Sequence, residues 1–234
     1  RDPEVISQHL KWSEHANIGL WVTSWSGPYS REDNTTREAI LTHPDLMETD
    51  HKIAVLYETF QRIFEEENYS LHRVTSDMQF LCAEYFDHSN YFQIDGKPVV
   101  YVYLTRLLED IGKLSEFIRL MRQSIQLACG QEVYIIGDHI FGPARPFSVQ
   151  DANEALDLLD GVTNIDVYGS FYKSLGSAGG YLEHEDVHRY FEIEQQEWKN
   201  ITNQRKCAYI PSVSPGFNDI ASKPEARRNP LSRS

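Results

Sequence analysis

The chain has 234 residues, of which 41% are hydrophobic, and this length and composition suit one large α/β domain or two small ones. Its formal net charge of −13 argues against nucleic acid or an anionic membrane surface as a partner. No apolar run reaches the roughly 18 residues of a membrane span, so we expect no membrane-spanning segment in this sequence. Cys82, Cys129 and Cys207 are too few and too scattered for a disulfide scaffold or a cysteine-based zinc site, and a single bridge remains open.

Short apolar strands and helices alternate along the sequence. Asp2-Pro3 is typical of a helix start, with proline at the first helical position. The predicted strands are 18–25, 52–58, 98–104, 132–138, 163–169 and 207–213. Capping residues and apolar spacings of three and four predict further helices over about 30–43, 71–85, 112–130, 148–161 and 184–204.

This alternation predicts parallel strands that are covered by helices on both faces. A doubly wound sheet and a (β/α)8 barrel both fit the pattern. However, no strand is followed by the Gly-x-Gly-x-x-Gly turn or the P-loop that a nucleotide-binding sheet carries. Polar and aromatic residues follow successive strands instead, as they do at the catalytic face of a barrel. We therefore predict an α/β fold of the (β/α)8 (TIM) barrel class, with one domain over residues 1–234 and six of the eight strands present.

Candidate site residues lie at the ends of these predicted strands. Trp25 could fill the core or offer a stacking surface for a sugar, and its place after Ser24 and before Gly-Pro favours the sugar. Glu58 could pair with Arg62, but a carboxylate at the C-terminal end of an apolar strand favours a functional role. Asp138 could serve the site or cap its loop equally well. The other candidates at strand ends are Tyr103, Tyr168 and Asn218.

A different chemistry is suggested by His184-Glu-Asp-Val-His188, which matches H-E-x-x-H. In that motif two histidines one helical turn apart bind zinc beside a glutamate base. The match lies at a helix start among Glu183, Asp186 and Arg189, and no third ligand follows at a recognised spacing. We interpret it as an accidental match on a solvated first turn. We expect no metal and no other cofactor, and a zinc peptidase remains the remote alternative.

A set of segments, taken in order, carries a resemblance to a known family. The segments are Asp2-Pro-Glu-Val-Ile6, Ile18-Gly19 through Ser24-Trp25, Tyr57-Glu58, Pro98-Val-Val-Tyr-Val-Tyr103, Asp166 with Tyr168, and Tyr209-Ile-Pro-Ser-Val-Ser-Pro-Gly-Phe-Asn-Asp219. In order and spacing they resemble glycoside hydrolase family 99, the glycoprotein endo-α-1,2-mannosidases, and related family 71-like glycan-active barrels. The last segment is the most specific, and the resemblance covers nearly the whole chain.

The resemblance implies a barrel that cuts within mannose-containing glycans with retention of configuration. The chain would be a fragment holding strands 2–7 of the barrel. Trp25 and Glu58 would line the subsite next to the scissile bond, beside Tyr103, Tyr168 and Tyr172. The implied partner is a glycan substrate, either an N-glycan or an α-mannan. The implied location is the secretory pathway, in the Golgi lumen, or the outside of the cell.

Three N-glycosylation sequons permit such a location without showing it. They are Asn34-Thr-Thr, Asn68-Tyr-Ser and Asn200-Ile-Thr.

The sequence also departs from the family's pattern. Where the endomannosidases have Glu-Pro-Tyr this chain has Glu58-Thr59-Phe60, and Leu104 stands where they have Asp. A non-catalytic or differently specific glycan-binding relative is therefore the main alternative. The family's catalytic glutamates, in an Asn-Glu-x-x-Glu segment of the eighth strand, are expected beyond Ser234. Because glycoside cleavage needs two carboxyl groups, the catalytic residues stay unassigned, and we expect these 234 residues alone to be inactive.

Overall fold

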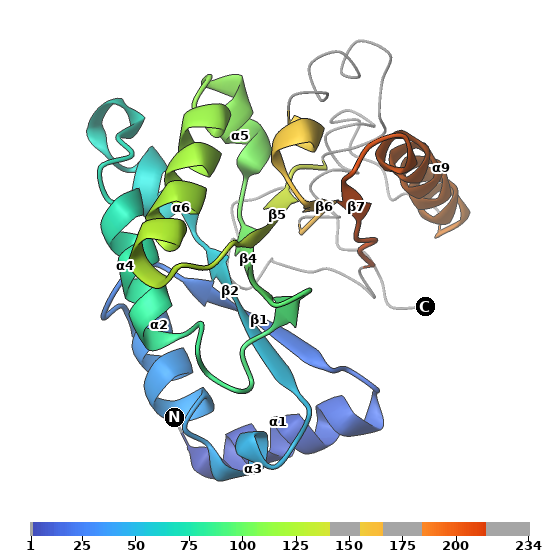
Figure 1. Cartoon of the computed structure of the whole chain (residues 1–234). Helices are drawn as coiled ribbons and strands as arrows, with labels where there is room; N and C mark the ends of the chain where they lie inside the picture. The colour runs from blue at the N-terminus through green and yellow to red at the C-terminus, as the bar shows by residue number, and fades with distance from the viewer. Residues whose placement is uncertain (1, 141–154, 166–183, 214–234) are drawn as a thin grey trace, which may run out of the picture. The chain divides into compact units, whose positions relative to one another are not determined.

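The computed structural model describes residues 2–140, 155–165 and 184–213, and the chain divides into two compact units, Arg1–Gly137 and Asp138–Ser234 (Figure 1). The elements of the first unit are α1 (Pro3–His15), β1 (Leu20–Trp25), α2 (Arg31–Thr35), η1 (Thr36–Ile40), α3 (Pro44–Met47), β2 (Lys52–Tyr57), η2 (Phe60–Phe64), η3 (Glu67–Tyr69), α4 (Val74–Glu84), β3 (Gln93–Ile94), β4 (Lys97–Val102), α5 (Thr105–Asp110), α6 (Leu114–Cys129) and β5 (Tyr134–Asp138), whose last residue opens the second unit. The described elements of the second unit are β6 (Gly161–Thr163), α9 (His184–Asn203) and β7 (Ala208–Tyr209), and residues 155–158 are also helical.

The strands of the first unit form a parallel sheet in sequence order. β1 pairs with β2, β2 with β4, and β4 with β5, all in parallel. In the second unit β6 and β7 are likewise parallel. The parallel α/β architecture predicted from the sequence is therefore confirmed. The hairpin strand β3, which pairs antiparallel with β4 around Asp95 and Gly96, was not predicted, because two residues are too short to give a periodic signal.

The helices follow from capping residues and apolar spacing. The side chain of Asp2 accepts a hydrogen bond from the backbone N–H of Glu4 and so caps α1. Along α6 the buried side chains are spaced so that they share one face, and the helix ends at Gly130 with φ of +70°. The single helix predicted over 30–43 is divided into α2 and the π-helix η1, with α3 starting afterwards at Pro44. In the described part of the chain, no helix has the length and apolar character needed to cross a membrane.

A buried carboxylate fixes the C-terminal end of β1. The indole N–H of Trp25 donates to Asp33 of α2 at 3.0 Å. The same carboxylate accepts the backbone N–H of Tyr29 at 2.9 Å and the hydroxyl of Tyr85 at 2.5 Å. Arg37 lies 3.6 Å away and supplies a positive charge. Asp33 is completely buried, so these donors replace the water that the charged group would otherwise need.

A second buried carboxylate fixes the end of β2. The hydroxyl of Tyr57 donates to Asp77 of α4 at 2.8 Å, and Arg62 donates to both carboxylate oxygens at 2.9 and 2.5 Å. Burial, reinforced by the nearby charge of Asp77, raises the pKa of Tyr57 well above its usual value, so the phenol stays a protonated donor. The rings of Tyr57 and Trp25 stack with their centroids 5.8 Å apart. The two carboxylates and the stacked pair therefore act as one buried network.

The turn after β1 requires glycine. Gly27 has φ of +112°, a backbone conformation that residues with a Cβ rarely adopt. A Cβ at this position would lie 2.6 Å from Nη1 of Arg62. The guanidinium thus packs directly on the turn, and its carbon lies 6.0 Å from the centroid of the Trp25 ring. The position of Arg62 ties the turn after β1 to the helix α4 through Asp77.

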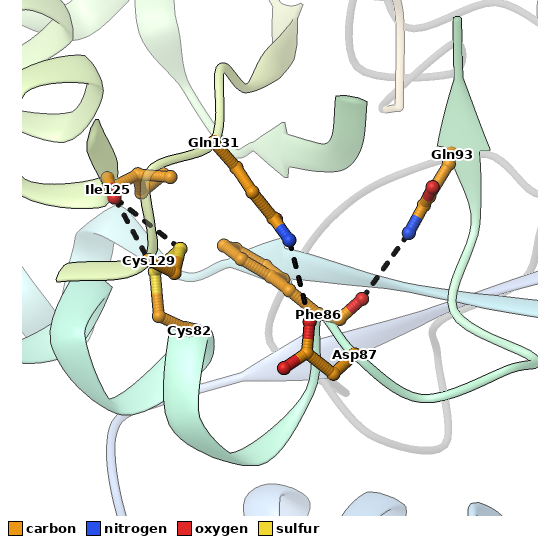
Figure 2. The surroundings of a disulfide bond; sticks show 7 residues. All are labelled: Cys82, Phe86, Asp87, Gln93, Ile125, Cys129 and Gln131. Carbon is orange, nitrogen blue, oxygen red and sulfur yellow. Dashed lines mark hydrogen bonds between the residues drawn. A yellow bond between two sulfur atoms is a disulfide. The ribbon is translucent and has the colours of Figure 1, made fainter. Parts of the chain in front are cut away.

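A disulfide joins Cys82 of α4 to Cys129 at the end of α6, two helices that pack against each other (Figures 1 and 2). The two Cα atoms are 5.9 Å apart, and the cysteines are 47 positions apart in the sequence. Figure 2 shows the carbonyl oxygen of Ile125 facing both sulfur atoms, at 3.9 and 3.4 Å. Cys207 is a buried free thiol, and burial raises its pKa to about 12, so it stays protonated at neutral pH.

The disulfide is expected to stabilise the fold by restricting the unfolded chain. For a closed loop of this length the chain-entropy relation gives about 4 kcal/mol, which the Cys82→Ser, Cys129→Ser double variant should lose in part or in full. Urea unfolding of the full-length protein, with and without reductant, measures this loss. If the free energy of unfolding is unchanged, or if peptide mapping finds Cys207 in the bridge, the assignment is wrong.

The buried pair of Arg62 and Asp77 gives a second prediction for stability. Asp77→Asn keeps the side-chain shape but leaves the Arg62 guanidinium, 12% exposed, without its counter-ion. We expect the free energy of unfolding to fall by about 3 kcal/mol. The matched control is Glu66→Gln, which breaks the more exposed pair with Arg73 and should cost less than about 1 kcal/mol. Equal losses in the two variants would contradict the role assigned to Asp77.

Candidate functional site

Trp25, Glu58 and Tyr103, three of the predicted site residues, lie at the C-terminal edge of β1, β2 and β4. Figure 1 shows these strands as arrows in one sheet. The backbone N–H of Glu58 donates to the carbonyl of Trp25 at 3.1 Å, and that of Tyr103 donates to the carbonyl of Tyr57 at 3.1 Å. The hydroxyl of Thr59 adds a bond of 2.7 Å to the carbonyl of Tyr103. These bonds continue the parallel ladder by one step beyond the strands, so the backbones of the three residues lie side by side.

The side chains of these residues do not share one face of the sheet. Trp25 and Tyr57 are register partners, and both reach the helices α2 and α4 through Asp33 and Asp77. Successive side chains of a strand alternate between faces. Glu58, which follows Tyr57, therefore lies on the face opposite to these helices. Tyr103 lies on this same face as Glu58, because Val102 is the register partner of Tyr57.

The placement of Trp25 corrects the expectation of a sugar platform. Its side chain is completely buried, and its ring contacts Tyr57, Phe80 and Arg62 in addition to the bond to Asp33. A sugar cannot stack on a ring that has no exposed surface. The alternative interpretation, a core tryptophan, is the one that fits, and its function is to hold the end of β1 in place.

Glu58 is half-buried. Its carboxylate does not form the ion pair with Arg62 that would have given it a structural role. The guanidinium of Arg62 is engaged by Asp77, whereas the backbone N–H of Arg62 donates to the backbone carbonyl of Glu58 at 3.3 Å. Tyr103 is also half-buried. A carboxylate and an aromatic residue that are neither fully exposed nor fully enclosed can both contact a ligand. They give this edge a hydrogen-bonding acid beside a flat apolar ring.

Asp138 lies at the end of β5 and is 2% exposed. Its carboxylate accepts the backbone N–H of Ile165 at 2.9 Å, which is the loop-capping role that the sequence left open for it. The backbone N–H of His139 donates to the carbonyl of Thr163 at 3.1 Å. Asp138 therefore supports the segment after β6, and a ligand contact would have to be made in addition.

A buried polar contact in the second unit was missed by the sequence analysis. Asn164 donates to Glu194 of α9 at 3.2 Å, and these residues are 4% and 3% exposed. Burial, with the charge of Glu194 adding to it, raises the pKa of Tyr209 to about 12. The sequence did contain a signal, since Glu194 lies four residues before the buried Trp198 on the same helix face.

The remaining candidates lie outside the described residues. These are Tyr168, Tyr172 and Asn218. The H-E-x-x-H match, 184–188, forms the start of α9 in the backbone, but the description does not extend to its side chains. Among the residues that are described, no group of three histidine, cysteine or carboxylate side chains is arranged to hold a metal ion.

Comparison with known proteins places this geometry in a family. The family model described as glycosyl hydrolase family 99 matches residues 1–234. Glycoprotein endo-alpha-1,2-mannosidase of Mus musculus is 25% identical over 241 residues, which cover 100% of this chain and 46% of the mouse protein. The Homo sapiens glycoprotein endo-alpha-1,2-mannosidase-like protein is 24% identical, with coverage of 100% and 47%. The chain thus spans about half the length of the curated relatives it matches.

Solved structures share the fold at low sequence identity. A glycoside hydrolase-like protein superposes with a TM-score of 0.65 at 16% identity, over 100% of this chain and 69% of that one. The GH99 endo-alpha-mannosidase of Bacteroides thetaiotaomicron gives a TM-score of 0.57 at 20% identity, over 94% of this chain and 56% of that one.

These similarities confirm the predicted fold class, an α/β fold that forms part of a (β/α)8 barrel. The family model also spans all the segments on which the resemblance rested. The chain belongs to glycosyl hydrolase family 99.

Proposed function

We propose that the protein to which this chain belongs is a glycoside hydrolase that cuts within mannose-containing glycans, as an endo-α-mannosidase, with retention of configuration. The observation that carries the proposal is the carboxylate of Glu58 at the C-terminal edge of β2, on the face that carries Tyr103. Family membership supports the reaction class, and the names of the mouse and bacterial relatives support the glycan. Asp138, Tyr168, Tyr172 and Asn218 remain proposed substrate contacts, and a single barrel domain remains the proposed organisation of the chain.

Glu58 would act on the substrate without being the acid that protonates the leaving oxygen. Cleavage of a glycosidic bond needs a proton donor on one side of the sugar and a carboxylate on the other. One carboxylate cannot fill both positions. We assign Glu58 to the region of the sugar's 2-hydroxyl, where a charged acceptor polarises the O–H bond, and Tyr103 to the apolar face of the same ring.

The two departures from the family's pattern bear on the alternative, a glycan-binding relative with another specificity or without catalysis. Thr59 is buried, and its hydroxyl holds the carbonyl of Tyr103. Leu104 is the N-cap residue of α5 and has φ of +53°, which is unusual for a leucine. Both positions lie beside the proposed contacts, so they support a substrate that differs from that of the named relatives.

A location in the secretory pathway or outside the cell is part of the proposal. The disulfide between Cys82 and Cys129 supports it, because such bonds persist in oxidising compartments. The sequon residues Asn68 and Asn200 are exposed, as attachment of a glycan requires. Asn34 is half-buried, and its amide donates to the carbonyl of Tyr29 at 3.1 Å.

The proposed role of Glu58 can be tested by Glu58→Gln in the full-length protein. This change keeps the shape but removes the charge, so we expect turnover of an α-mannan oligosaccharide to fall about a hundredfold or more. The free energy of unfolding should stay within about 0.5 kcal/mol, because the carboxylate holds no described ion pair. Glu65→Gln, an exposed carboxylate on the same loop, is the control and should keep full turnover. Unchanged kinetics in Glu58→Gln would make the residue structural.

A further prediction concerns the extent of chain needed for activity. The family's Asn-Glu-x-x-Glu segment does not occur in the 234 residues, so we expect these residues alone to release no product from an α-mannan oligosaccharide. The full-length protein should release a short mannose-containing product under the same conditions, as measured by chromatography. Turnover by the 234-residue chain would show that its own carboxylates, with Glu58 and Asp138 first, form the catalytic pair.

A further inference from the structure

Three aromatic residues that no part of the proposed site uses lie together on the segment between β2 and α4. We call Phe60, Phe64 and Tyr69 the aromatic ridge. The ring centroids of Phe60 and Phe64 are 6.5 Å apart, and those of Phe64 and Tyr69 are 5.9 Å apart. Phe60 is 50% exposed and Tyr69 is 44% exposed. Single exposed aromatic residues are common, whereas three in contact form an apolar surface that needs an explanation.

The ridge is attached to the proposed site through the backbone. Phe60 begins η2 only two residues after Glu58. Thr59 between them is completely buried, and its hydroxyl is bonded to the carbonyl of Tyr103. This fixed link holds the near end of the ridge at the edge of the sheet where Glu58 and Tyr103 lie.

The far end of the ridge is held in an unfavourable backbone conformation. Asn68 and Tyr69 have φ of 56° and 53°, and a positive φ is rare for a bulky side chain such as tyrosine. The segment is anchored there by the ion pair between Glu66 and Arg73, at 2.6 Å. The fold therefore keeps the Tyr69 ring at the surface, although the local backbone conformation opposes it.

Polar side chains form a hollow beside Tyr69. This cavity has a volume of about 550 Å³, and the residues lining it include Asn68, Ser70, His72, Thr75, Lys113 and Glu116. Most of these residues offer hydrogen-bond donors or acceptors, and the charges present have both signs. An apolar ridge next to a polar hollow matches a ligand that has apolar faces and many hydroxyl groups.

We propose that the aromatic ridge binds sugar rings of the glycan that lie outside the pair joined by the cleaved bond. A pyranose ring presents a face of C–H groups that packs on an aromatic ring by dispersion and burial of apolar area. Its hydroxyl groups point outward from that face, toward hydrogen-bonding partners such as those of the hollow. The chain's net charge of −13 favours neutral sugars over sulfated or phosphorylated ones. This inference rests on the proposed function and assigns the ridge to that same site.

A purely structural role for the ridge makes a different prediction. An aromatic ring contributes most to the free energy of folding when it is fully buried, as the rings of Trp25 and Tyr57 are. Phe60 and Tyr69 instead leave about half of their surface to solvent. Removing either ring should then affect ligand binding more than the free energy of unfolding.

The test compares binding of two probes, a mannose disaccharide and a mannose hexasaccharide prepared from α-mannan. Every protein in the comparison is full-length and carries Glu58→Gln, because the active protein would cut the hexasaccharide during the titration. The protein is produced in a bacterial periplasm, which forms disulfides and leaves the Asn68 sequon without a glycan. Phe60→Ala and Tyr69→Ala should each raise the Kd for the hexasaccharide about fivefold, measured by titration calorimetry, and leave the Kd for the disaccharide unchanged. Tyr69→Phe keeps the ring and should keep the affinity.

The matched control is Trp12→Ala, which removes an aromatic side chain that is 60% exposed on α1 and should change neither Kd. Thermal unfolding of each variant verifies that the fold is retained. If the Glu58→Gln protein with an intact ridge binds the hexasaccharide and both ridge variants bind it equally well, the ridge is not a subsite, while the proposed function stands. Equal loss of affinity for both probes also overturns the inference. If the Glu58→Gln protein with an intact ridge binds neither probe, this inference fails, and if the protein with Glu58 also releases no product from the hexasaccharide, the proposed function fails with it.

Discussion

The arrangement of the candidate site depends on two buried carboxylates that flank a stacked pair of aromatic rings. Asp33 holds the indole of Trp25, and Asp77 holds the hydroxyl of Tyr57 together with the guanidinium of Arg62. Each carboxylate satisfies its charge with donors from a different element, so the ends of β1 and β2 cannot shift independently of α2 and α4. A rigid edge of this kind is what a ligand site needs beneath it.

The same network decides which residues can meet a ligand. Because Trp25 and Tyr57 point toward the helices, the next residue along β2, Glu58, points to the other face. The loop that continues from Glu58 carries the aromatic ridge of Phe60, Phe64 and Tyr69. One strand thus supplies a core tyrosine, a carboxylate for the site and the start of an exposed apolar surface within four residues of sequence, from Tyr57 to Phe60.

Low sequence identity to the relatives is compatible with the shared fold. The solved family 99 enzyme shares 20% of its residues with this chain, yet the fold superposes over 94% of it. Packing tolerates substitution of hydrophobic residues when volume and pattern are kept, so the fold outlasts the sequence. Residues at strand ends and in loops are freer to diverge than core residues, and Glu58, Thr59 and Leu104 all lie just beyond the end of a strand.

The sequence by itself determined the alternation of strands and helices, the strand ends on which Glu58 and Tyr103 lie, and the family. Apolar runs, capping residues and motif order are local properties, so they can be read along the chain. Only the tertiary structure decided that Trp25 is a core residue, that Asp138 supports a loop, and that Cys82 pairs with Cys129. The face on which a strand residue lies, and the partner that satisfies a buried charge, depend on contacts between residues far apart in sequence, such as Tyr57 with Asp77. Such contacts exist only once the chain has folded.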